Sequence, residues 1–293
     1  MTIAIIGLGL IGGSIALDLR ENNYGSRFIG VDNNLHHCEK AVELNIVDEI
    51  HGLVDAVKIA DLVILAVPVN VMRLLMTEIL DNLSEYAILI DVGSTKQGVC
   101  QIARFHPKRT NFVACHPLAG TENTGPEAAL HHLFKGKVNI ICEQELSHDW
   151  AVEKVHHLFS EVLKMRNIYM NPTEHDRHIA FVSHLSHISS FTLGLTVLDI
   201  EKDEKHIFNM ASTGFASTVR LAKSSAKMWT PILEENAENI SSSLDAYINQ
   251  LQDFKDLIDR GDFEAVYKRI EQANDIRRIL DGIELKHIAF SNT

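Results

Sequence analysis

The sequence predicts an α/β protein in two parts, an N-terminal parallel-sheet domain over residues 1–171 and an all-α domain over residues 172–293. Three observations predict it. A strand, a glycine-rich turn and a helix open the chain. Short apolar runs then alternate with helical patterns up to about residue 170, and the strand pattern disappears after that. Strands alternating with helices are typical of right-handed βαβ units in an open parallel sheet.

The opening stretch has the spacing of a dinucleotide-binding turn. The strand Ile3–Ile6 leads into G-x-G-x-x-G, followed by a helical pattern to Glu21. The first glycine permits a tight turn, the second lets the backbone approach a pyrophosphate, and the third lets the helix pack on the strand. An ordinary strand–turn–helix without a nucleotide is the alternative. The expected phosphate-binding residues are Gly7, Leu8, Gly9, Leu10, Ile11 and Gly12.

An acidic residue follows the second strand at the position expected for ribose binding. The strand Phe28–Val31 ends in Asp32, twenty residues after Gly12. A carboxylate there accepts hydrogen bonds from ribose hydroxyls and repels a 2′-phosphate. The sequence therefore favours NAD over NADP.

The remaining elements of the first half complete the predicted sheet. The expected strands lie within residues 61–68, 87–90, 111–115, 138–142 and 167–170, and the expected helices over 35–44, 71–80 and 150–163. Ligands of such sheets bind beyond the carboxyl ends of the strands. Residues at such ends are Asp32, Val67, Pro68, Ser94 and His116, and we expect Val67 and Pro68 to contact the cofactor.

The second half is predicted to contain only helices, over His175–Leu198, Glu204–Lys223, Thr230–Arg260 and Phe263–Leu280. The first is apolar on several faces. A helix of that kind is expected to be buried, and a subunit interface is one place for it.

Composition excludes several classes of function. The net charge of −12 and the absence of a basic stripe disfavour a nucleic-acid partner. Four scattered cysteines indicate small buried residues in a reducing compartment. No run is expected to reach transmembrane length, and the sequence opens directly on a strand. We therefore expect a soluble, cytoplasmic protein with no membrane partner.

His116 is the first candidate for chemistry. It lies at a strand end, before a proline and a Gly-Thr loop, facing the expected cofactor crevice. A neutral imidazole there can take a proton from a substrate hydroxyl as hydride leaves the same carbon. The alternative is a histidine that only satisfies a loop carbonyl.

Two further clusters carry polar groups. His184 and His187 are three residues apart on a predicted helix and share a face. Two histidines alone make a poor metal site, so we expect no metal. Arg220 lies in an otherwise small and apolar stretch, where a guanidinium should meet an anion. That anion is either a substrate carboxylate or a structural carboxylate such as that of Glu122.

These motifs together resemble those of the prephenate dehydrogenases and the closely related arogenate dehydrogenases. The matching segments are IIGLGLIGGS, DLVILAVPV, DVGSTK, HPLAGTE, SHLSH, and GF followed by Arg220 and MW. The resemblance implies NAD bound on a Rossmann-type domain and a homodimer formed through the C-terminal helices. It also implies oxidative decarboxylation of prephenate to 4-hydroxyphenylpyruvate in tyrosine biosynthesis.

The resemblance also implies roles for individual residues. His116 matches the catalytic histidine that hydrogen-bonds the ring hydroxyl, and Ser94 matches a serine that assists at the same hydroxyl. Arg220 matches the arginine that binds a substrate carboxylate. His187 and Thr121 match further positions of the substrate pocket.

One position departs from the family pattern, and three alternatives to a prephenate dehydrogenase stay open. Many relatives have an aspartate where this chain has Ser217, which leaves open how Arg220 is held. Arogenate is the alternative substrate, although His187 favours prephenate. Another two-domain hydroxy-acid dehydrogenase would explain only the first half. A non-catalytic NAD-binding sensor or assembly protein would keep the glycine turn without needing His116 and Arg220.

Overall fold

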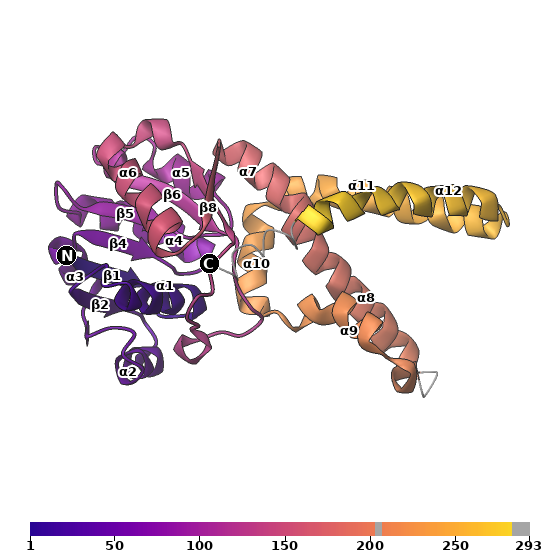
Figure 1. Ribbon diagram of the computed structural model, residues 1–293, viewed down its shortest axis with the longest axis horizontal. Helices are drawn as coiled ribbons and strands as arrows, with labels where there is room; N and C mark the ends of the chain where they lie inside the picture. The colour runs from indigo at the N-terminus through magenta and orange to yellow at the C-terminus, as the bar shows by residue number, and fades with distance from the viewer. Residues whose placement is uncertain (203–206, 283–293) are drawn as a thin grey trace. The chain divides into compact units, whose positions relative to one another are not determined.

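The computed structural model describes residues 1–202 and 207–282, and it confirms the predicted α/β fold with a helical second half (Figure 1). Eight strands form one sheet in the order β3-β2-β1-β4-β5-β6-β7-β8. Their bounds are β1 Thr2–Ile6, β2 Arg27–Val31, β3 Glu49–Ile50, β4 Leu62–Leu65, β5 Ile88–Asp91, β6 Phe112–Pro117, β7 Val138–Cys142 and β8 Arg166–Met170.

The sheet is parallel from β3 to β6, whereas β7 pairs with β6 in the antiparallel direction. The sequence predicted an open parallel sheet, and this one antiparallel pairing departs from it. A parallel connection needs a long crossover, usually a helix. Between β6 and β7 the chain has only a short 3₁₀ turn at Pro126–Ala128. It therefore returns alongside β6, and β8 then pairs in parallel with β7.

Helices cover both faces of the sheet and enclose two apolar cores. On β1, Ile3 belongs to the core that includes Ile15 of α1, and Ala4 belongs to the core that includes Met76 of α4. Alternate side chains of a strand point to opposite faces, which produces this division. The helices are α1 Leu10–Glu21, α2 Leu35–Glu43, α3 Leu53–Ile59, α4 Val69–Asn82, α5 Gln97–Ala103 and α6 Asp149–His157. The sequence did not predict β3, α3 or α5.

The second half begins with one long helical segment, Pro172–Glu201. It consists of α7 (Pro172–Ile179), a π-helical turn (Ala180–His184) and α8 (Leu185–Glu201). Asn171 caps its start by accepting a hydrogen bond from the Glu174 N–H. By length and composition alone this segment could cross a membrane, so the expectation that no run reaches transmembrane length is wrong.

The other predicted helices are shorter than expected. The one predicted over Glu204–Lys223 starts outside the described residues, and its described part is divided into Ile207–Met210, α9 (Thr213–Val219) and Arg220–Lys223. The helix predicted over Thr230–Arg260 is broken at Asn236. Its parts are α10 (Ala226–Glu235) and α11 (Ala237–Asp259), and α12 (Phe263–Ala273) follows.

By its contacts the chain divides into two compact units. The first is Met1–Ala237, which contains the sheet and α7 to α10. The second begins at Glu238 and contains α12 and most of α11. All the candidate site residues lie in the first unit.

Candidate active site

The glycine turn has the shape that a pyrophosphate requires. Gly7 has φ +97°, and a Cβ there would lie 2.5 Å from the Ala66 carbonyl oxygen. A Cβ on Gly12 would lie 2.1 Å from the Gly7 carbonyl oxygen, whereas a Cβ on Gly9 would meet nothing within 4 Å. The open space therefore lies above Gly9, which caps α1 without a side chain of its own. Backbone N–H groups at this helix start can face an anion.

Asp32 follows β2 and is tied to the same turn. Its Oδ2 accepts the Leu8 N–H at 2.9 Å and lies 3.4 Å from His37 Nδ1, and its Oδ1 accepts the Asn34 N–H at 2.9 Å. The side chain is 11% exposed, so the carboxylate is fixed but reachable. Of the other expected cofactor residues, Leu8 and Leu10 are buried, Ile11 and Val67 are half-buried, and Pro68 is exposed.

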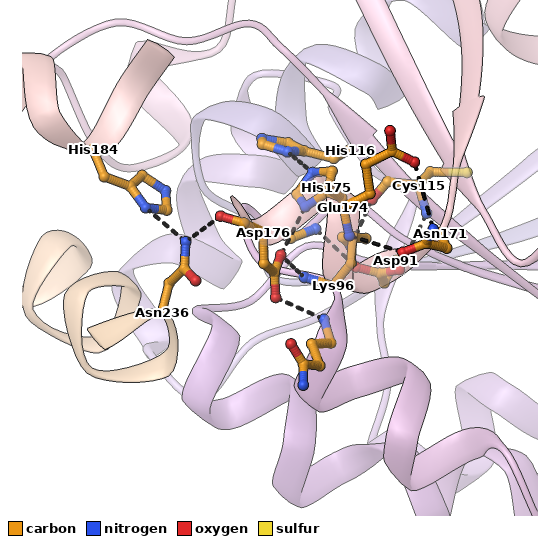
Figure 2. Close-up of polar contacts among 12 residues, drawn as sticks. Asp91, Lys96, Cys115, His116, Asn171, Glu174, His175, Asp176, His184 and Asn236 are labelled. Atoms are coloured by element: carbon orange, nitrogen blue, oxygen red, sulfur yellow. Dashed lines mark hydrogen bonds and ion pairs between the residues drawn. The ribbon is translucent and has the colours of Figure 1, made fainter. Parts of the chain in front are cut away.

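His116 lies at the end of β6 and takes part in a chain of hydrogen bonds that the sequence did not reveal (Figure 2). Its Nδ1 lies 2.8 Å from His175 Nε2, and His175 Nδ1 lies 2.7 Å from Asp176 Oδ1. Exposed fractions are 7% for His116 and 1% for both His175 and Asp176. The first turn of α7 thus brings an imidazole and a carboxylate behind His116.

Backbone groups before and at the start of α5 hold the carboxylate of Asp176. The Lys96 N–H donates to its Oδ1 at 2.8 Å and the Gln97 N–H donates to its Oδ2 at 2.9 Å. The Lys96 side chain is fully buried, pairs with Asp91 and donates to the Cys115 carbonyl oxygen at 2.7 Å. These contacts fix α7 against the carboxyl ends of β5 and β6.

Burial keeps the histidines of this region neutral. It is the main cause that lowers the pKa of His116 well below its usual value, and His175, Lys96 and His184 lower it further. Burial also lowers the pKa of His175, although neighbouring Asp176 opposes the shift. The pKa of His184 falls to about 4, again mainly through burial. A neutral imidazole is the form that can accept a proton.

A second cluster of polar and aromatic side chains lies at the end of the π-helical turn and just after it. His187 stacks on Trp229 with ring centroids 3.6 Å apart, and its Nδ1–H donates to the Ser183 carbonyl oxygen at 3.0 Å. His184 meets Trp229 edge-on and accepts from Asn236 at 3.2 Å. Both histidines of SHLSH therefore contact one indole. Trp229 Nε1 and His184 Nε2 are buried without a hydrogen-bond partner in the part of the chain that the structure describes.

Arg220 is exposed, and its Nη1 lies 3.7 Å from Glu122 Oε2. Glu122, which the sequence suggested as a structural partner of Arg220, therefore lies near the guanidinium. The Ser217 hydroxyl donates to the Gly214 carbonyl oxygen at 2.8 Å and offers Arg220 no charge. Thr121 is half-buried and accepts the Asn123 N–H at 3.2 Å.

Ser94 is half-buried and lies three residues beyond the end of β5. Because β5 pairs with β6, Ser94 and His116 follow neighbouring strands at the same edge of the sheet. The sequence analysis missed His175 and Asp176. Their signal was a His-Asp pair four and five residues after the cap residue Asn171, ahead of the apolar part of the long helix.

Comparison with known proteins gives a consistent result along the chain. The family model described as prephenate dehydrogenase, nucleotide-binding domain, matches residues 15–167. The model described as prephenate dehydrogenase, dimerization domain, matches residues 171–272. A prephenate dehydrogenase of Bacillus subtilis is 34% identical over 97% of this chain and 76% of its own length.

Two solved structures are similar in fold and sequence. Prephenate dehydrogenase from A. aeolicus, in complex with hydroxyphenyl propionate and NAD+, has a TM-score of 0.87 and 31% identity. The match covers 96% of this chain and 98% of that one. Arogenate dehydrogenase from Synechocystis has a TM-score of 0.76 and 28% identity. It is matched over its whole length and 96% of this chain.

Proposed function

The chain belongs to the prephenate dehydrogenase family, and from this premise we propose that its substrate is prephenate and its product 4-hydroxyphenylpyruvate. It is an NAD-dependent oxidoreductase of tyrosine biosynthesis. The observation that carries the proposal is His116. It is a buried neutral imidazole at the end of β6, at the strand-end edge of the sheet where the glycine turn of β1 also lies.

NAD, when bound, supplies the acceptor for the hydride that leaves the ring carbon bearing the hydroxyl. The glycine turn from Gly7 to Gly12 would hold its pyrophosphate, and Asp32 would bind a ribose. The fit rests on the open space above Gly9 and on the fixed, reachable carboxylate of Asp32. Val67 and Pro68 would contact the cofactor from the end of β4.

His116 handles the hydroxyl proton. As hydride leaves carbon, the O–H bond breaks and Nε2 of His116 takes the proton. The ring then loses carbon dioxide, and the electrons of the broken C–C bond make it aromatic. The phenol oxygen takes the proton back from His116. The proton therefore makes a round trip, and the protein needs no route that carries it to solvent.

The other residues bind and orient the substrate. We assign Arg220 to a substrate carboxylate, since it is a reachable guanidinium in a chain whose net charge repels anions. Ser94 would assist at the ring hydroxyl from the strand beside His116. His187, held by its stacking on Trp229, and Thr121 would complete the substrate pocket.

We also propose a cytoplasmic homodimer. α8 carries apolar side chains that are exposed in one chain, including Leu195 at 61% and Leu198 at 51%. A match to a dimerization domain over the same region supports burial of this face by a second copy. We assign cofactor binding to residues 1–171 and substrate binding and dimerisation to 172–293. Four free cysteines fit a reducing compartment.

The test is NADH formation at 340 nm with prephenate and arogenate offered separately, each with NAD and then NADP. Strong turnover of prephenate with NAD that is lost in His116→Gln supports the proposal. Preference for arogenate would keep the chemistry and change the substrate, an alternative that the similar Synechocystis arogenate dehydrogenase favours. A folded protein that binds NAD but turns over neither substrate would contradict the catalytic role.

A further inference from the structure

We propose that His175 and Asp176 are positioning residues that fix the tautomer of His116 and share the proton it accepts. The inference rests on the proposed role of His116 as the base. The three side chains form a chain of two hydrogen bonds, of 2.8 Å and 2.7 Å, enclosed in the protein (Figure 2).

The direction of each hydrogen bond follows from the carboxylate at the end of the chain. An ionised Asp176 can only accept, so the proton between it and His175 lies on His175 Nδ1. A neutral His175 then has a bare Nε2, which can only accept from His116. His116 must therefore carry its proton on Nδ1, which leaves its Nε2 bare. That nitrogen is the one available to a substrate hydroxyl.

Asp176 is held firmly enough to impose this order. Two backbone N–H groups, of Lys96 and Gln97, donate to its two carboxylate oxygens. Asn236 donates to its backbone carbonyl oxygen at 2.7 Å. A carboxylate has no hydrogen to donate, so it meets the His175 N–H, like the two backbone N–H groups, only by accepting. It is therefore an acceptor in the resting protein.

The same chain stabilises the proton after transfer. Protonation of His116 at Nε2 places a cation in a buried position, beside Lys96 from the start of α5 and His184 from the π-helical turn. If the Nδ1 proton moves to His175 Nε2, the N–H bond on His116 breaks and one forms on His175. The positive charge then lies next to Asp176, with Asp91 of β5 and the Lys96 ammonium that pairs with it also nearby. The reverse movement returns the proton.

A closed chain suits this reaction. Because the phenol oxygen recovers the proton, His175 and Asp176 do not have to release it to water. Their exposure of only 1% is therefore compatible with the reaction. An enzyme that released the proton would need a connection to solvent at this point.

Two variants separate the fixing of the His116 tautomer from the sharing of its proton. Asp176→Asn removes the charge that fixes the proton on His175 Nδ1 and sets an amide N–H among the three N–H groups that donate to the carboxylate, so the order of both hydrogen bonds is no longer imposed. We expect kcat to fall by roughly 10²–10⁴-fold at every pH, as for wrong-tautomer variants of other enzymes. His175→Gln keeps an acceptor for His116 Nδ1–H but cannot take a proton. We expect a loss of about 10-fold in kcat with the His116 tautomer unchanged, since the Gln carbonyl oxygen still accepts its Nδ1–H.

A spectroscopic readout is independent of turnover. In 15N-histidine-labelled protein, the His116 signals, assigned by their loss in His116→Gln, should show an unprotonated Nε2. In Asp176→Asn a fraction with a protonated Nε2 should appear. Melting temperature and NAD affinity report folding, and if Asp176→Asn does not fold, His175→Gln carries the test.

The matched controls are His106→Gln and Asp81→Asn, which remove another His–Asp hydrogen bond of the sheet domain, 3.1 Å long. They should leave kcat and the pH profile unchanged. Unchanged kcat and an unprotonated Nε2 in folded Asp176→Asn would overturn the inference. If the wild type turns over neither substrate while its His116 shows the expected tautomer, the proposed function fails and the tautomer assignment stands.

Discussion

Gly9 and Gly12 belong to the same turn and meet different surroundings. A Cβ on Gly12 would lie 2.1 Å from a backbone oxygen, which cannot move away without displacing the start of α1. A Cβ on Gly9 would project into open space. The G-x-G-x-x-G pattern thus combines a residue needed by the fold with one needed by the ligand.

We therefore expect opposite outcomes from two alanine substitutions. Gly12→Ala should destabilise the protein by about 1–3 kcal/mol or more, the cost of overpacking, and lower Tm by roughly 3–10 °C. Gly9→Ala should leave Tm without ligand unchanged but weaken NAD binding at least about 10-fold. Differential scanning fluorimetry and NAD titration measure both. Equal effects of the two substitutions on Tm would contradict this assignment.

The pKa of His116 determines where activity depends on pH. Because burial lowers this pKa well below the usual value of 6.5, the imidazole is already neutral at pH 7. We expect kcat/KM to rise with pH only in the acid range and to be flat from about pH 6.5 to 8. Steady-state rates in overlapping buffers measure the profile. A rise that continues between pH 7 and 8 would show that another group controls the reaction.

At the scale of elements, apolar runs and caps predicted most helices and strands because each signal is local. Asn34 directly precedes the helix predicted over 35–44, and its side chain accepts the His36 N–H at the start of α2. The direction of β7 and the short elements β3 and α5 depend on packing between distant segments, which local patterns do not contain. The same limit hid the contact of His116 with His175, which lies 59 residues further along the chain.

α8 gives a prediction about assembly. Leu195 and Leu198 are three residues apart, share a helix face and are more than half exposed in one chain. Leu195→Glu should place an uncompensated charge in the proposed interface and convert the dimer to monomer. Light scattering after size-exclusion chromatography measures the mass. Leu74→Glu on α4, where the leucine is 78% exposed, is the control and should remain dimeric. An unchanged mass for Leu195→Glu would exclude this face as the interface.

Across the whole molecule, buried neutral histidines connect the site to stability. His116, His175, His184 and His187 all have pKa values lowered mainly by burial. As pH falls below about 6.5 the unfolded chain binds protons at these residues and the folded protein does not, so acid favours unfolding. For His184, with a folded pKa of about 4, this dependence extends from about pH 6.5 to 4.

We therefore expect the free energy of unfolding to fall as the pH decreases below about 6.5, with His184 contributing about 1 kcal/mol per pH unit between about pH 6.5 and 4. Chemical denaturation at pH 7.5, 6.0 and 5.0 measures the slope. His184→Asn should reduce the slope. If the slope is the same in wild type and His184→Asn, His184 does not contribute to the pH dependence of the free energy of unfolding.

The sequence predicted the parallel sheet followed by helices and the residues that match motifs, because both depend on the local spacing of residue types. It did not predict which side chains support His116, because that support comes from a helix of the other half of the chain. His175 contacts His116, and Asp176 contacts the Lys96 N–H, only because the start of α7 packs against the ends of β5 and β6.

The π-helical turn at Ala180–His184 divides the long helix into two functional halves. A π-helical turn contains one residue more than an α-turn, so it rotates everything after it by about 100° relative to what precedes it. His175 before it contacts His116, and His187 after it stacks on Trp229. Gain or loss of one residue at this turn would rotate the second half and leave the first in place. On the proposed assignment of His116 and His187, the residues for proton transfer and for substrate choice lie on opposite sides of this turn, so a change of substrate need not alter the residues that contact the base.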